Sequence, residues 1–111
     1  MQIYRQGDVL IIAVAADRIP AQSTYVPRDA GRIVLAYGEV TGHSHAIVDS
    51  AGAVLLATPD TEDRFLRIMS SSGVELRHEE HDTVVLPTGD YLIRIQREYM
   101  SKDMPAIRVS D

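Results

Sequence analysis

Hydrophobic residues occur along the chain in short runs or in alternation with polar residues, and glycine, proline, aspartate and serine separate these runs. A period of two indicates β-strands, and the period of an amphipathic helix is nearly absent. The pattern predicts strands at Asp8–Ala15, Arg32–Tyr37, His43–Asp49, Ala53–Ala57, Arg64–Ser70, Val74–Arg77, Thr83–Leu86, Tyr91–Tyr99 and Ala106–Val109, with a polar loop over Asp17–Asp29.

This pattern predicts an all-β fold, either a small antiparallel barrel or a two-sheet sandwich. A flat sheet of about eight strands would leave apolar faces and edges exposed. The segments Arg64–Ser70 and Val74–Arg77 are expected to form a hairpin around Ser71, Ser72 and Gly73. At 111 residues the chain has the usual size of one domain, so we expect a single domain over residues 1–111.

The strand at Tyr91–Tyr99 has two faces of different character. Alternation places Tyr91, Ile93 and Ile95 on one face, and Arg94, Gln96 and Glu98 on the other. The polar face is either a solvated surface or a secondary site for an anionic ligand.

Charge and composition narrow the classes of function. The formal net charge is −5 and no basic run occurs, which argues against general nucleic-acid binding and favours cations. The chain has no cysteine, so any metal must be held by nitrogen and oxygen ligands. The longest apolar run, Val9–Ala16, is too short to span a bilayer, and the residues before it do not resemble a signal peptide. We therefore expect a cytoplasmic protein without a membrane partner.

All four histidines lie in two short motifs. The first is Gly38-Glu39-Val40-Thr41-Gly42-His43-Ser44-His45, in which His43 and His45 project to the same face of a strand. The pair offers two imidazoles to one ion, and a durable site needs at least a third ligand.

The second motif, His78-Glu79-Glu80-His81, supplies two more imidazoles and two carboxylates. On an extended backbone His78 shares a face with Glu80, and Glu79 shares the other face with His81. Val74, Leu76 and His78 are two residues apart and so share one face of the strand. His78 and Glu80 are therefore expected to face inside, unless a turn at the glutamates resets the register.

Together the motifs predict a divalent-metal site with His43, His45, His78 and His81 as candidate ligands. Zinc, manganese, iron and nickel all accept imidazole and carboxylate. Glu79 and Glu80 are candidate catalytic residues, because a carboxylate that does not bind the metal can move a proton. A metal-dependent hydrolase or oxygenase acting on a small molecule is compatible with this set.

Two other interpretations remain open. The histidines can be structural hydrogen-bonding groups in a non-catalytic interaction or assembly module, which includes a homo-oligomer. They can also form a pH-responsive interface, because imidazole titrates near neutrality. Serine catalysis is disfavoured, since Ser44 faces away from its flanking histidines and no Gly-x-Ser-x-Gly motif occurs. The second motif also lacks the His-Glu-x-x-His spacing of a helical metalloprotease.

The pair His43 and His45, with the Pro87-Thr88-Gly89 turn, resembles the cupin superfamily of small β-barrels. In that family a His-x-His pair, a carboxylate and a later histidine hold a metal. Here Asp49 stands in the region of the carboxylate, and Leu92 occupies the position of the later histidine. The motifs, together with Gln96-Arg97-Glu98-Tyr99, also resemble a group of uncharacterised short bacterial and phage-type proteins, a resemblance that implies no activity.

Overall fold

The computed structural model describes residues 2–38, 42–48, 52–99 and 106–108. In these ranges one 3-10 turn, η1 (Ala16–Arg18), accompanies twelve strands. The strands are β1 (Ile3–Gln6), β2 (Val9–Val14), β3 (Thr24–Tyr25), β4 (Ile33–Tyr37), β5 (Ser44–Ile47), β6 (Ala53–Ala57), β7 (Arg64–Ile68), β8 (Val74–Leu76), β9 (Val84–Leu86), β10 (Gly89–Ile95), β11 (Arg97–Tyr99) and β12 (Ala106–Arg108). Glu39, Val40 and Thr41 of the first motif, and Asp49 of the cupin resemblance, lie outside the described residues.

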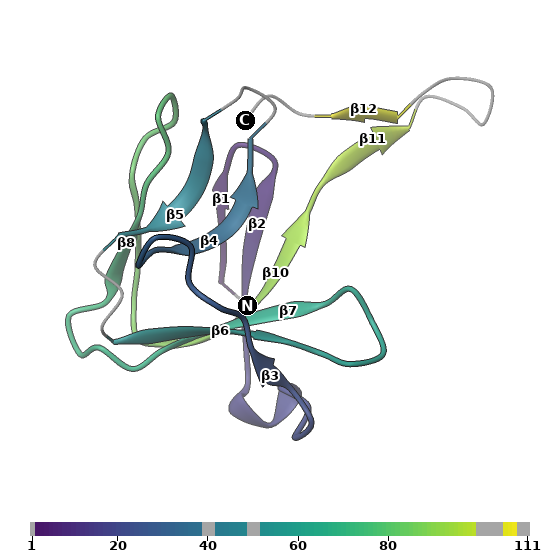
Figure 1. Ribbon diagram of the computed structural model, residues 1–111, viewed down its shortest axis with the longest axis vertical. Coiled ribbons are helices and arrows are strands. Elements are labelled where there is room, and N and C mark those ends of the chain that lie inside the picture. The colour runs from purple at the N-terminus through teal and green to yellow at the C-terminus, as the bar shows by residue number, and fades with distance from the viewer. Residues whose placement is uncertain (1, 39–41, 49–51, 100–105, 109–111) are drawn as a thin grey trace.

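The main sheet has six strands in the order β1-β2-β10-β7-β6-β3, and neighbouring strands are antiparallel (Figure 1). Strands β2 and β10 lie inside the sheet, and the nearly continuous apolar sequence of β2 is typical of such a central strand. Their register places Ile93 opposite Ile11 and Tyr91 opposite Ala13. The all-β antiparallel prediction is confirmed.

Two strand pairs, β4–β5 and β8–β9, face the main sheet, and an isolated bridge between Ala46 and Arg77 joins them. The bridge has two backbone hydrogen bonds, of 2.9 Å from the Ala46 N–H and 2.8 Å from the Arg77 N–H. Side chains of both layers form one buried cluster, which includes Ile11, Leu35, Ile47, Leu76, Leu86 and Tyr91. Among the described strands the main sheet stays open, with β1 and β3 at its edges, so no closed barrel forms.

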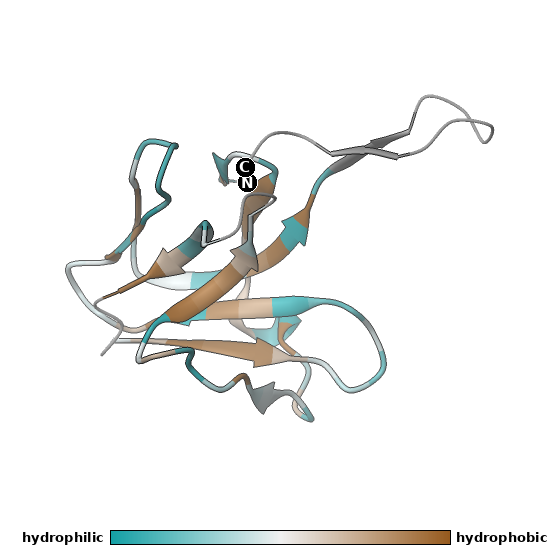
Figure 2. Ribbon diagram, turned by 45° about the horizontal axis from the view of Figure 1, so that its top comes forward, coloured by the Kyte–Doolittle hydropathy of each residue, from teal (hydrophilic) through white to brown (hydrophobic). Residues whose placement is uncertain are grey.

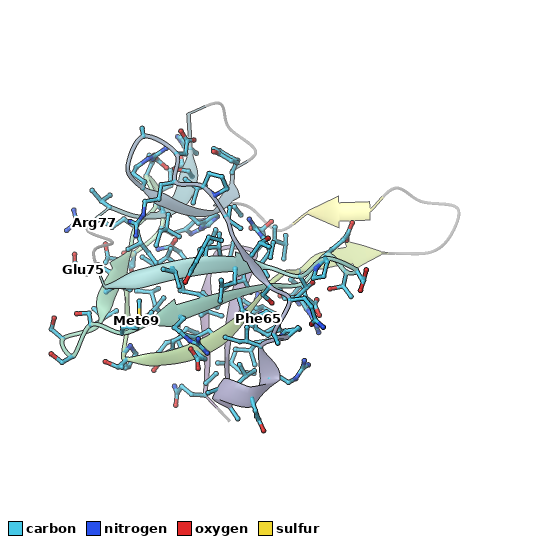
Figure 3. All side chains as sticks on the ribbon, turned by 60° about the horizontal axis from the view of Figure 1, so that its bottom comes forward. Phe65, Met69, Glu75 and Arg77 are labelled. Atoms are coloured by element: carbon cyan, nitrogen blue, oxygen red, sulfur yellow. The ribbon has the colours of Figure 1, made fainter. Side chains whose placement is uncertain are left out.

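The opposite face of the main sheet carries a second, smaller apolar cluster. Leu56, Phe65 and Leu92 are buried there, and Ile19 from the segment after η1 packs against them. Figure 2 shows how hydropathy is distributed over the fold, with hydrophobic residues along the strands and hydrophilic residues at many of the loops. Figure 3 shows Phe65 on the main sheet, and Glu75 beside Arg77 at the edge of the molecule. The last two side chains form an exposed ion pair of 2.6 Å.

The predicted hairpin around Ser71, Ser72 and Gly73 is wrong. Strand β7 pairs with β6 and β10, whereas β8 pairs with β9. The turn at residues 71–73 therefore carries the chain from the main sheet into the facing layer. It does not join two paired strands.

The main sheet contains two strands that the hydrophobic pattern did not predict, β1 and β3. Both lie at its edges, where exposed positions weaken the apolar signal. The predicted apolar face of the Tyr91 strand agrees with the structure, since Tyr91 and Ile93 are buried in the main core cluster and Ile95 packs against it. On the predicted polar face Arg94 is exposed and Gln96 is partly buried. The part of the chain that the structure describes contains no helix long and apolar enough to cross a membrane.

Candidate metal centre

The bridge between Ala46 and Arg77 determines which residues of the two histidine motifs meet. Extending this antiparallel pairing towards the start of β5 places the last three residues of the first motif opposite the first three of the second. The pairs are His45 with His78, Ser44 with Glu79, and His43 with Glu80. The sequence predicts that the two motifs meet, but it does not determine this register.

Contacts between imidazole rings link all four histidines. The His78 ring centroid lies 5.4 Å from that of His43, 4.4 Å from that of His45 and 4.7 Å from that of His81. The rings of His45 and His81 are 6.0 Å apart and nearly parallel, at 18°. We call these four residues the histidine cluster. His78 is at its centre.

Residues 78–81 form a turn, and His78 organises it. Its Nδ1 accepts hydrogen bonds from the backbone N–H groups of Glu80, at 3.0 Å, and His81, at 3.3 Å. The alternative in which a turn resets the register therefore holds, and the extended alternative does not. As a result His78 and His81 both contact His45, although they differ in parity.

Glu79 connects this turn to β5. Its Oε1 accepts a 2.9 Å hydrogen bond from the Ser44 backbone N–H. That bond lowers the pKa of Glu79, and a hydrogen bond from its own N–H and the nearby His43 and His78 lower it further. Glu79 is therefore held as a carboxylate beside two imidazoles. The Ser44 hydroxyl accepts a 3.1 Å hydrogen bond from Arg32.

Glu80 lies at the exposed edge of the histidine cluster. Its Oε2 is 3.8 Å from His43 Nδ1, and the two side chains are 60% and 19% exposed. Glu80 was expected inside, but its side chain is more exposed than that of His43.

His45 is fully buried, and two buried residues that were not predicted from the sequence as part of the site lie beside it. Its Nδ1 lies 2.9 Å from Gln6 Oε1, and its Nε2 lies 3.8 Å from Oδ1 of the buried Asp8. Gln6 is the last residue of β1, and Asp8 is the second residue of the turn that leads into β2. A two-residue Gly-Asp turn is a known hairpin signal, so Gly7-Asp8 could have revealed β1 and the turn, though not its contact with His45.

His43, His78 and Glu79 form a group that could hold a metal ion. One ligand atom from each lies within 4.8 Å of the other two. Ligands of one zinc-sized ion are about 3 to 3.5 Å apart, so small side-chain rotations would be needed to close the group. Because His78 Nδ1 already accepts the hydrogen bonds of the turn, a cation on this ring would compete with them. Where Glu79 acts as a ligand, Glu80 is the carboxylate left for proton transfer.

The fold and this site define an all-β antiparallel domain with a histidine-rich group suited to a metal ion. The chain belongs to the family described as Domain of unknown function (DUF8820), whose model matches residues 5–96. The matched range includes all four histidines, Gln6 and Asp8, and it carries no cupin assignment. The searches of curated proteins and of solved structures gave no match.

Proposed function

We propose that this protein binds a divalent transition-metal ion in the histidine cluster, with His43, His78 and Glu79 as its ligands. The observation that carries the proposal is the convergence of two imidazoles and one ionised carboxylate, from two distant segments, within 4.8 Å. Two histidines and one carboxylate suit zinc, manganese, iron or nickel. The net charge of −5 also favours cations over anions.

The exposure of this group of ligands supports a catalytic use of the metal. Glu79 is exposed and His43 is partly exposed, so solvent and a small-molecule substrate have access to this side of the cluster. A divalent ion bound there would supply Lewis acidity and lower the pKa of water. Glu80, beside His43, would then accept the proton. Metal-assisted hydrolysis is the reaction class that this arrangement supports best, and oxygenation uses a similar ligand set.

Calorimetric titration of untagged protein with Zn²⁺ tests the metal proposal. Glu79→Gln removes the charge but keeps an oxygen that can accept the Ser44 N–H, so the turn should survive. We expect this variant to bind zinc at least ~100-fold more weakly, beyond the 10–100-fold effect typical of outer-shell partners. Glu62→Gln, in an exposed loop, is the control and should bind like the wild type. Equal affinity in both variants would reject Glu79 as a ligand.

A second variant tests the catalytic step. We expect Glu80→Gln to retain zinc and to lose most turnover of any activated ester that the zinc-loaded wild type hydrolyses. Unchanged turnover with unchanged zinc affinity would exclude Glu80 as the base.

An interaction module is the second candidate function, and one surface feature favours it. Tyr25 is 74% exposed and Met69 is 55% exposed, and both line a surface hollow with Ile19, Pro20 and Leu56. Exposed apolar groups around a hollow are typical of protein-binding surfaces. A concentration-dependent oligomer that Tyr25→Ser abolishes, with no metal bound, would favour this function over the first.

A further inference from the structure

Gln6 connects three segments that meet at the histidine cluster. The residue ends β1 and is only 2% exposed. Its Nε2 donates two hydrogen bonds, of 2.8 Å to the Leu76 carbonyl and of 3.0 Å to the Asp82 carbonyl. Its Oε1 lies 2.9 Å from Nδ1 of His45. One buried amide therefore contacts β5, β8 and the residue that follows the turn at residues 78–81.

These partners fix the orientation of the Gln6 amide. Carbonyl oxygens only accept hydrogen bonds, so the atom beside Leu76 and Asp82 is the Gln6 nitrogen, which uses both of its hydrogens there. The Gln6 oxygen consequently accepts the proton of His45 Nδ1. A buried polar group whose donors are all used in this way rigidifies its surroundings.

The two carbonyls stand on either side of the turn that carries His78 and Glu79. Leu76 lies two residues before His78, and Asp82 comes directly after the turn. Because both oxygens lie within 3.0 Å of one nitrogen, the two ends of the turn are held close together. Gln6 therefore closes the turn from outside, whereas the hydrogen bonds to His78 Nδ1 close it from within.

The oxygen of Gln6 acts on the same turn by a second route. It holds the buried ring of His45, whose centroid is 4.4 Å from that of His78. In a close-packed interior, a fixed His45 ring limits the rotation of the His78 ring beside it. Both routes lead to the second motif, which supplies two of the three proposed ligands, His78 and Glu79.

Positioning matters for this metal group because its ligands come from two segments. His43 precedes β5, whereas His78 and Glu79 belong to the turn, and one ligand atom from each lies within 4.8 Å of the other two. Ligands that are already held near their bound positions lose less freedom when the ion binds, so the affinity is higher. Groups that orient metal ligands typically contribute about 10–100-fold to metal affinity.

We propose that Gln6 is a positioning residue of the metal centre, which holds the turn at residues 78–81 and the His45 ring where the three proposed ligands can bind one divalent ion. Gln6 thus controls metal affinity within the folded protein, beyond its contribution to folding. The inference rests on the proposed function and deepens it, because it assigns control of that affinity to a residue outside the ligand set.

Calorimetric titration of untagged Gln6→Met with Zn²⁺ tests the positioning role. Methionine has nearly the length and volume of glutamine but makes none of its three hydrogen bonds. We expect the folded variant to bind zinc about 10–100-fold more weakly than the wild type. Tyr91→Phe is the control, because it also loses a hydrogen bond to a backbone carbonyl, that of Pro87, but outside the histidine cluster. It should bind zinc like the wild type.

Urea unfolding of the same proteins separates positioning from folding. If Gln6→Met is less stable but, when fully folded, binds zinc with wild-type affinity, Gln6 has a structural role only. That result overturns the inference and leaves the proposed function standing. A wild type that binds no zinc instead rejects the proposed function, and the inference with it.

A second variant keeps the inference testable if Gln6→Met does not fold. Gln6→Asn keeps the amide but is one methylene shorter, so it cannot reach all three partners at once. We expect its zinc affinity to be at least ~10-fold below that of the wild type. Wild-type affinity in folded Gln6→Asn would reject the positioning role.

Reciprocity of coupled equilibria gives a further test in the wild type alone, which applies even if neither variant folds. If the hydrogen bonds of Gln6 favour zinc binding, zinc must favour these hydrogen bonds by the same factor. We therefore expect saturating zinc to slow hydrogen exchange of the Gln6 side-chain amide by about 10-fold or more. The exposed Gln22 amide is the control and should be unaffected. A Gln6 exchange rate that zinc does not change would contradict the inference.

Discussion

At the scale of single residues, the most deeply buried of the four histidines shows how the fold accommodates a polar core. His45 has no exposed surface, and its Nδ1 is paired with Gln6, whose amide in turn is paired with two carbonyls. Buried polar groups are tolerated when they are hydrogen-bonded, and networks of this kind rigidify their surroundings. Gln6 therefore ties β1 to both β8 and the segment before β9.

Tyr91 gives a residue-scale prediction for alkaline stability. Its hydroxyl donates to the Pro87 carbonyl at 2.7 Å, and its pKa is raised by burial first, then by Tyr4 and Asp90. A raised pKa means that the folded state disfavours tyrosinate. This contribution to the free energy of unfolding is thus complete below about pH 10 and is lost as the pH rises further.

The measurement is urea unfolding of the wild type and of Tyr91→Phe between pH 7 and pH 11. At pH 7 we expect the free energy of unfolding of Tyr91→Phe to be lower than that of the wild type by about 0.5–1.5 kcal/mol, the usual value of one hydrogen bond. Above about pH 10 the difference should shrink, because only the wild type can ionise Tyr91 on unfolding. The exposed Tyr25→Phe is the control. A difference that stays constant across this range would contradict the assignment.

At the scale of elements, the hydrophobic pattern predicted most strands within one or two residues but not their partners. Apolar runs such as those of β2 and β10 identify buried strands, because burial itself produces the pattern. The pairing of β8 with β9, and not with β7, depends on contacts between layers, which a local pattern does not contain. The turn at Gly73 looked like a hairpin for this reason.

Gly73 itself carries an element-scale prediction. Its φ is +77°, and a Cβ there would lie 2.5 Å from the Leu86 carbonyl oxygen, which is backbone of β9. Gly31 has a similar φ of +80° but open space around the same position. Both alanine variants incur the left-handed backbone cost of about 1–2 kcal/mol. Only in Gly73→Ala should the free energy of unfolding fall by about a further 1–3 kcal/mol, because the added Cβ overpacks the contact with Leu86.

Urea unfolding of Gly73→Ala and Gly31→Ala measures this difference directly. Gly73→Ala should lower the free energy of unfolding more than Gly31→Ala does. If they are equal, the close approach of the turn to β9 does not constrain residue 73.

The candidate site shows the same division between what sequence can and cannot predict. The four histidines and Glu79 and Glu80 could be identified from their motifs, because few other residues of the chain offer metal ligands at such spacing. The separate faces expected for His78 and His81 failed, because a side chain–backbone hydrogen bond of His78 creates the turn. Gln6 and Asp8 were missed, because they reach His45 across a sequence separation of more than 35 residues.

At the scale of the whole molecule, the two layers act as the frame that brings distant segments together. The main sheet places Gln6 and Asp8 at one end of its β1–β2 hairpin, and the facing strand pairs place both histidine motifs against them. The core cluster between the layers fixes this arrangement, since it includes residues of both. The histidine cluster therefore depends on the packing of the complete domain.

Elemental analysis of protein purified without a histidine tag tests the central claim, metal binding by the histidine cluster, most directly. We expect at least one near-stoichiometric equivalent of a divalent transition metal in the wild type. We also expect the loss of that metal from a folded His43→Ala/His45→Ala variant, which removes the proposed ligand His43 and the buried His45, whose ring contacts that of the ligand His78. A folded wild type without metal after incubation with Zn²⁺, or a double variant that retains the full amount, would contradict it.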